Sequence, residues 1–144
     1  CLSRGLGDVY KRQGMGVDEV YQGKYTHRHT GMGTVVEDDI YIQDGEARLH
    51  IFPLPSSHAK GCVALEVNED WCFLGDALYA MQKCGHNLYN AGVLKEEIAV
   101  LENVKAKHFM LSHRTPFETP KEIIMRWLGD IYDRRVKGEV YIEG

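Results

Sequence analysis

Three residues of types that commonly bind metal ions stand at the ends of short apolar runs. His58 lies in PSSHAKG, Asp76 in FLGDALY and His113 in HFMLSHRTP. Side chains that follow buried strands collect at one edge of a sheet, where loops build binding sites on a rigid scaffold. Imidazole and carboxylate groups suit zinc and similar divalent ions. The three residues therefore predict a metal site at a sheet edge.

The runs between these residues predict the elements that carry them. Alternating apolar residues indicate strands, and polar turns such as Asp44–Gly45 separate them. Residues 62–75 are typical of a hairpin whose second strand is buried. The predicted strands are 40–43, 46–55, 62–67, 71–75, 107–112 and 139–143, and the predicted helices are 93–104 and 119–136.

Both predicted helices have an apolar face at helical spacing. In the first helix, this face comprises Leu94, Ile98, Leu101 and Val104. The second is expected to begin with Thr119 as N-cap and Pro120 as the first helical residue. Its apolar stripe comprises Ile123, Ile124, Trp127, Leu128, Ile131 and Tyr132. Strands come first and helices later, so we predict a layered α/β (α+β) fold in which helices cover one sheet face.

Composition narrows the class of protein. Of 144 residues, 44% are hydrophobic and 26% charged, which fits one globular domain with a modest core. A net charge of −4 without a stripe of Lys and Arg argues against nucleic-acid binding. No apolar run reaches the ~18 residues that a membrane span needs. Cys62, Cys72 and Cys84 lack CxxC spacing, so we expect no thiolate metal cage, and this fits a cytoplasmic location.

The N-terminal stretch SRGLGDVYKRQ (residues 3–13) has no apolar period and resembles a translated adapter from a sequencing library. Segments of this kind are excluded from fold reasoning. We therefore divide the chain into an artefactual segment, 1–13, and a domain, 14–144. We also expect the natural protein to extend upstream of Gly14.

Three short motifs resemble the C-terminal half of the metallo-β-lactamase-fold hydrolases. SHAKGC is similar to the third metal motif of that family and supplies His58. FLGDALY is similar to the fourth and supplies Asp76. LSHRTP is similar to the fifth, with His113 preceded by Ser112 where the family usually has Gly. The resemblance covers residues 39–144 and implies the C-terminal half of an αββα sandwich.

The resemblance also implies a chemistry. His58 would complete the imidazole set of a first metal ion, Asp76 would bridge two ions, and His113 would bind the second. The two divalent ions are expected to be zinc, with iron or manganese as alternatives. A hydroxide held between them would attack a small-molecule substrate, and Asp76 is assigned the catalytic role. The bond cleaved is that of an ester, thioester, lactam or phosphodiester.

The principal motif of that family, His-x-His-x-Asp-His, has no intact counterpart upstream of His58. THRHTGMG contains His27 and His29, but Thr30 and the residues after it depart from the motif. We interpret this pair as a decoy near the site. The chain is therefore expected to be an incomplete domain that hydrolyses nothing by itself.

Other polar and aromatic residues are weaker candidates. Substrate contacts are expected from Lys60, which follows His58 closely, and from Arg114. His86 and Tyr89 lie in the predicted loop after Asp76, where members of the family often place such contacts. Structural or packing roles are expected for Tyr41, His50, Trp71 and His108.

Two other functions stay open at the level of sequence. A redox relative of the same fold would hold two irons and place a Glu among its upstream ligands. A non-catalytic binding module would keep His58, Asp76 and His113 as structural residues of a decayed metal site. The upstream ligand motif decides among the three, because only an intact motif supports a hydrolase.

Overall fold

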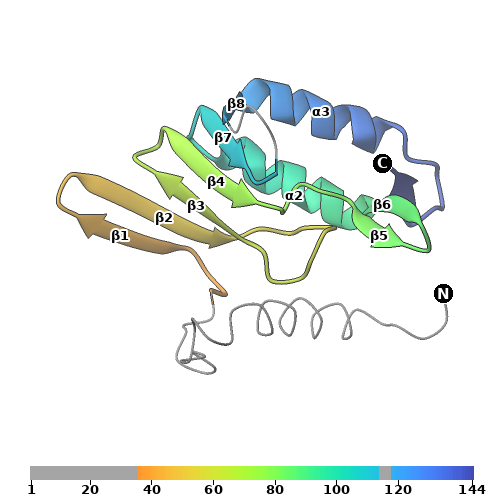
Figure 1. The fold of residues 1–144 in the computed structure, drawn as a ribbon, viewed down its shortest axis with the longest axis horizontal. Helices are drawn as coiled ribbons and strands as arrows, with labels where there is room; N and C mark the ends of the chain where they lie inside the picture. The colour runs from red at the N-terminus through yellow and green to blue at the C-terminus, as the bar shows by residue number, and fades with distance from the viewer. Residues whose placement is uncertain (1–35, 114–117) are drawn as a thin grey trace. The chain divides into compact units, whose positions relative to one another are not determined.

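The computed structural model describes residues 36–113 and 118–144. Within them the fold is mixed α+β, as the order of predicted elements indicates (Figure 1). The predictions for residues 3–13, for His27 and His29 and for Arg114 lie outside the described residues. The elements are β1 (Ile40–Asp44), β2 (Ala47–Pro53), β3 (Val63–Val67), β4 (Trp71–Gly75), β5 (Met81–Lys83), β6 (His86–Asn90), α2 (Ala91–Asn103), β7 (His108–Leu111), β8 (Glu118–Pro120), α3 (Lys121–Asp133) and β9 (Tyr141–Glu143).

The larger sheet has six strands in the order β1-β2-β3-β4-β7-β8. Its neighbours are antiparallel except for β4 and β7, which are parallel. The β3–β4 hairpin turns at Asn68 and Glu69, both of which have positive φ, as a tight turn of right-handed twist requires. The parallel pair matters most for function, because it brings the carboxyl ends of β4 and β7 to the same edge.

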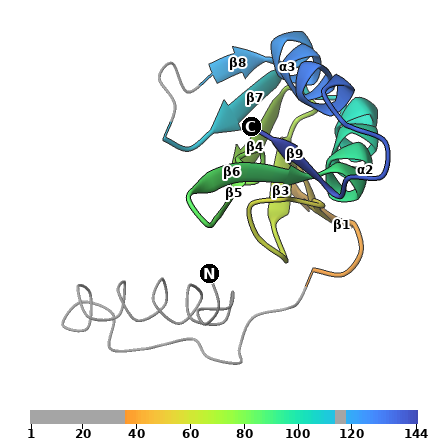
Figure 2. The same cartoon turned by 90° about the vertical axis from the view of Figure 1, so that its right-hand side faces the viewer.

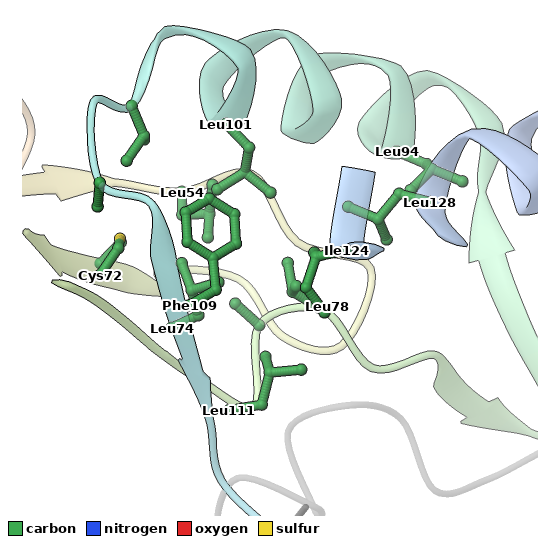
Figure 3. Packing of buried hydrophobic residues seen from close by; sticks show 14 of the residues in the cluster. Leu54, Cys72, Leu74, Leu78, Leu94, Leu101, Phe109, Leu111, Ile124 and Leu128 are labelled. Atoms are coloured by element: carbon green, nitrogen blue, oxygen red, sulfur yellow. The ribbon is translucent and has the colours of Figure 1, made fainter. Parts of the chain in front are cut away.

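The two helices pack side by side against one face of this sheet (Figure 2). Phe109 lies at the centre of the core and is surrounded by side chains from the sheet and from α2 (Figure 3). The predicted face of α2 is confirmed at Leu94 and Leu101, which are fully buried. The fully buried hydrophobic side chains include Cys72, Leu74, Leu78, Leu94, Leu101, Phe109, Ile124 and Leu128.

The loop predicted after Asp76 contains a hairpin instead. β5 and β6 are joined by Cys84 and Gly85, both at positive φ, and β6 also pairs with β9 in a second, three-stranded sheet. The segment MQKCGHNLYN has too few apolar residues to show a strand period. Its pairing with β9 depends on a partner far along the chain, so local sequence did not reveal it.

The predicted start of the second helix was wrong. Thr119 and Pro120 belong to β8, where Thr119 pairs with Phe109 of β7, and α3 begins at Lys121. Thr119 is buried against the sheet, so pairing with β7 overrides its preference for a cap. The apolar stripe of α3 is narrower than predicted: Ile124, Leu128 and Ile131 are buried, whereas Ile123 is 50% exposed.

The sheet face away from the helices carries a continuous apolar row. The register aligns one residue from each of five neighbouring strands: Ile40, Ile51, Leu65, Phe73 and Met110. Phe73, in β4, is 43% exposed, whereas its neighbours Cys72 and Leu74, whose side chains point to the helix side, are buried. The two faces are therefore both apolar, and the helices among residues 36–113 and 118–144 cover only one of them. None of the helices that the structure describes combines the length and apolarity needed to cross a membrane.

Candidate metal centre

Asp76 lies one residue beyond the end of β4, in a tight turn. The register between β4 and β7 shifts between Phe73 and Gly75, and Gly75 has a φ of +56°. A hydrogen bond from Tyr79 N to Asp76 O, 3.0 Å long, closes the turn that follows. The Asp76 side chain is 39% exposed, so its carboxylate is presented at the sheet edge.

His58 is held in the loop between β2 and β3 by two hydrogen bonds. Its backbone N donates to Ser56 Oγ at 3.1 Å, and its Nδ1 lies 3.5 Å from Ala80 O. A carbonyl oxygen can only accept, so this contact places the ring proton on Nδ1. The other nitrogen, Nε2, faces Asp76 Oδ2 at 3.9 Å with its lone pair available to a metal.

His113 lies two residues beyond the end of β7 and reaches Asp76 from the other side. Its Nε2 lies 3.5 Å from Asp76 Oδ1, and its side chain is 78% exposed. Its φ is +58°, in the left-handed region that side chains with a β-carbon rarely adopt. Such strain is often stored at functional sites. The parallel pairing of β4 and β7 thus brings together two residues that lie far apart in sequence.

The spacing between Asp76 and each imidazole is close to that between two ligands of one metal ion. Two ligands of a tetrahedral zinc ion lie about 3.3–3.6 Å apart when each bond is ~2.0–2.2 Å long. His113 Nε2 and Asp76 Oδ1 are within this spacing, and His58 Nε2 and Asp76 Oδ2 are slightly wider. Among the described residues, no three His, Cys, Asp or Glu side chains are grouped so that they could hold an ion by themselves. Each position therefore has two donors, and each needs further ligands.

The weaker candidates have different surroundings. Lys60 is exposed. His86, in β6, is exposed and lies 3.0 Å through Nδ1 from Glu143 Oε1. Tyr89 is buried in the core, and its hydroxyl donates to Leu78 O at 3.1 Å. Burial, with a smaller effect of the nearby Glu97, raises the pKa of Tyr89 to about 12, so we place this side chain in the packing rather than on a binding surface.

A second cluster of one histidine and two carboxylates lies toward the opposite end of the sheet. His50 Nε2 is 3.1 Å from Asp39 Oδ2, and His50 Nδ1 is 3.1 Å from Glu66 Oε2. Glu66 is buried, and its other oxygen accepts from Ala106 N at 2.6 Å. The ring of His50 also stacks on Tyr41 with centroids 4.4 Å apart. We refer to Asp39, His50 and Glu66 as the His50 cluster, and to His58, Asp76 and His113 as the Asp76 cluster.

The two clusters differ in whether a histidine ring nitrogen remains available to bind a metal ion. Both nitrogens of His50 are used, which agrees with the structural role predicted for it. A cavity of about 220 Å³ lies beside His50 and Lys105. Lys105 pairs with Glu69 at 2.8 Å and His50 with Glu66 at 3.1 Å, and Arg48 also lines this cavity. We therefore look for metal chemistry at the Asp76 cluster.

Sequence reasoning missed three contributors to these clusters. Ser112 and Tyr79 hydrogen-bond around Asp76, and Glu66 anchors the His50 cluster. Ser112 stands next to His113, and that adjacency was the available signal. Glu66 gave none, because its partners lie far from it in the chain.

Comparison of the chain with protein-family models, with curated proteins and with solved structures returned no match. The geometry of the site therefore carries the functional argument.

Proposed function

We propose that this chain carries part of the dinuclear metal site of a hydrolase with a metallo-β-lactamase-like fold. One observation carries the proposal: the two oxygens of one carboxylate, Asp76, each face a different imidazole. A carboxylate suits the position between two cations because it offers two oxygens and one negative charge. Zinc, iron or manganese fits this mixed donor set of nitrogen and oxygen.

The proposed role of each residue follows from where its metal-binding atom lies. His58 offers Nε2 because Ala80 O fixes the proton on Nδ1. Asp76 holds the two positions at a fixed separation, and His113 completes the donor pair at the more exposed one. Divalent ions bound there lower the pKa of water and stabilise the negative charge that develops on a carbonyl or phosphoryl oxygen.

The uncovered sheet face supports the sandwich. An aqueous surface does not favour a contiguous apolar row five strands wide, and large apolar patches of this kind are typical of interfaces. In the proposed αββα arrangement, a second sheet packs on Ile51, Leu65 and Phe73, while α2 and α3 form the outer layer. That second sheet would supply the ligands that each ion position lacks.

The substrate is proposed to be a small molecule with an ester, thioester, lactam or phosphodiester bond. Lys60 and His86 are exposed and remain proposed contacts for it, together with Arg114. Tyr89 is not part of this proposal, because its hydroxyl is used inside the core.

Titration of the full chain with Co²⁺, followed by NMR of the histidine rings, tests the site. Paramagnetic Co²⁺ is expected to broaden the signals of His58 and His113 first and to leave those of His50 unchanged. Asp76→Asn keeps the shape of the side chain and lowers its charge, so it should weaken broadening at both rings. Equal broadening of His50, or no effect of Asp76→Asn, contradicts the proposal.

Hydrolysis is measured in parallel on chromogenic ester, thioester, lactam and phosphodiester substrates, and no turnover is expected from this chain alone, because each proposed ion position has only two donors. A rate that rises with added Co²⁺ in the unmodified chain and not in Asp76→Asn would overturn that expectation and identify the bond class. The Asp76→Asn variant is the matched control, since it differs from the parent by one atom and one charge.

A further inference from the structure

Ser112 uses every polar group it has to join the end of β7 to the turn after β4. Its backbone N donates to Gly75 O at 3.1 Å. Its carbonyl oxygen accepts from the Tyr79 hydroxyl, and its own hydroxyl donates to Asp76 Oδ1. One residue therefore contacts three members of the segment that carries Asp76.

These bonds bear most directly on the His113 side of the Asp76 cluster. Asp76 Oδ1, which accepts from Ser112, is also the oxygen that His113 Nε2 faces at 3.5 Å. His113 follows Ser112 directly and has a positive φ, so a fixed backbone must hold it there. His58 faces the other oxygen, Oδ2, and is held by Ala80 O and Ser56 Oγ instead.

We propose that Ser112 is a positioning residue for the ion position between Asp76 and His113. Its hydroxyl fixes the rotation of the Asp76 carboxylate, and its backbone fixes the point from which His113 projects. This inference rests on the proposed metal site. The two oxygens of the Asp76 carboxylate turn together, so the Ser112 hydroxyl serves both positions, and the Ser112 backbone in addition places His113.

Three variants of the full chain separate these contributions. Ser112→Ala removes only the bond to Asp76, Ser112→Thr keeps a hydroxyl, and Tyr79→Phe removes only the bond to the Ser112 carbonyl. The probe is Co²⁺ alone, followed at the ring signals of His58 and His113. Loss of a partner of a metal ligand typically weakens metal binding by about 10–100-fold. We expect Ser112→Ala to raise the apparent Kd read at His113 by about tenfold, with the ring signals of His50 unchanged.

A second measurement needs no metal. In the metal-free chain, Ser112→Ala should shift the ring signals of His113, because the freed carboxylate can rotate away. Ser112→Thr should restore both the shifts and the Co²⁺ affinity. Tyr79→Phe should move His113 and also His58, whose ring lies edge-on to that of Tyr79 with centroids 6.4 Å apart. A variant that merely weakened folding would move the signals of His50 as well.

The outcomes are distinct. Weaker binding at His113 with His50 unchanged and with rescue by Thr supports the role of Ser112. If the parent binds Co²⁺ and Ser112→Ala binds it equally at both rings, the role of Ser112 is overturned and the metal site stands. If the parent shows no Co²⁺ effect at either ring, the proposed site fails, and the inference fails with it.

Discussion

The His50 and Asp76 clusters are both built from imidazole and carboxylate groups and have opposite properties. In the His50 cluster, each ring nitrogen lies 3.1 Å from a carboxylate oxygen, within hydrogen-bond distance. In the Asp76 cluster, the imidazoles stand 3.5 and 3.9 Å from the carboxylate. The first spacing satisfies the groups with one another, and the second is close to that of two ligands of one ion. Distance alone does not identify a metal site, since His108 Nε2 also lies 3.8 Å from Asp70 Oδ1 while its Nδ1 pairs with Glu118 Oε1 at 2.8 Å.

The largest expected effect is on stability at the His50 cluster. Glu66→Ala removes the carboxylate that accepts a hydrogen bond from Ala106 N, just after the end of α2. It also removes one of the two carboxylate partners of His50. Leaving such groups unpaired should lower the free energy of unfolding by about 3 kcal/mol. Asp76→Ala should cost less, about 1 kcal/mol, because Asp76 and its partners His58, Ser112 and His113 are all at least partly exposed to water.

Urea denaturation of the two variants measures this difference. Glu66→Gln is the matched control, since it retains an oxygen for Ala106 N and should lose less than Glu66→Ala. If Asp76→Ala destabilises the chain as much as Glu66→Ala, the Asp76 cluster is also structural.

A carboxylate without partners completes the comparison. Glu97 in α2 is fully buried, and neither of its oxygens has a hydrogen-bond partner among the described residues. Burial raises its pKa from the usual 4.5 to about 9. The folded chain therefore keeps a proton that the unfolded chain releases, so stability is greatest at low pH and is lost as pH rises from 4.5 through 9.

Between pH 6 and pH 8 the free energy of unfolding should fall by about 2 kcal/mol on this account, since a one-proton difference is worth up to about 1.4 kcal/mol per pH unit. Glu97→Gln cannot ionise and should remove this slope. The test is urea denaturation of both chains across that range. Parallel pH profiles for the parent and Glu97→Gln would show that Glu97 is not the group responsible.

The smallest expected effect concerns the backbone at His113. Its φ of +58° costs roughly 1 kcal/mol for a residue with a β-carbon. His113→Gly should therefore raise the free energy of unfolding by about 0.5–1 kcal/mol. His113→Ala removes the same ring and keeps the β-carbon, so it should bring no such gain.

Thermal denaturation compares the two variants directly, with the corresponding His50→Ala as a reference from the other cluster. His50→Ala should destabilise the chain, since both of its ring nitrogens have carboxylate partners. Equal stability of His113→Gly and His113→Ala would indicate that the turn carries no strain.

Local sequence predicted the features that depend on near neighbours. The hairpins of β1–β2 and β3–β4 follow from alternation and polar turns, and Leu94 and Leu101 were assigned to the buried face of α2. It also selected His58, Asp76 and His113, which the structure brings together because each follows a strand that ends at one edge.

Features that depend on distant partners were not predictable in this way. Thr119 has the pattern of a helix cap, but pairing with Phe109 draws it into β8. Glu97 stands three residues after Leu94 and four before Leu101, on the apolar face of α2, but its charge favours exposure, and its burial follows from how the helix packs. Ser112 acquires its role only when β7 lies beside β4. In each case a contact across the chain outweighs the local preference.

Diffraction from crystals of the full chain soaked in Zn²⁺, recorded on both sides of the zinc absorption edge, tests the metal site most directly. We predict an anomalous peak beside Asp76, between its carboxylate and the Nε2 atom of His58 or His113. A peak at the His50 cluster or at His86 and Glu143, with none beside Asp76, would contradict it.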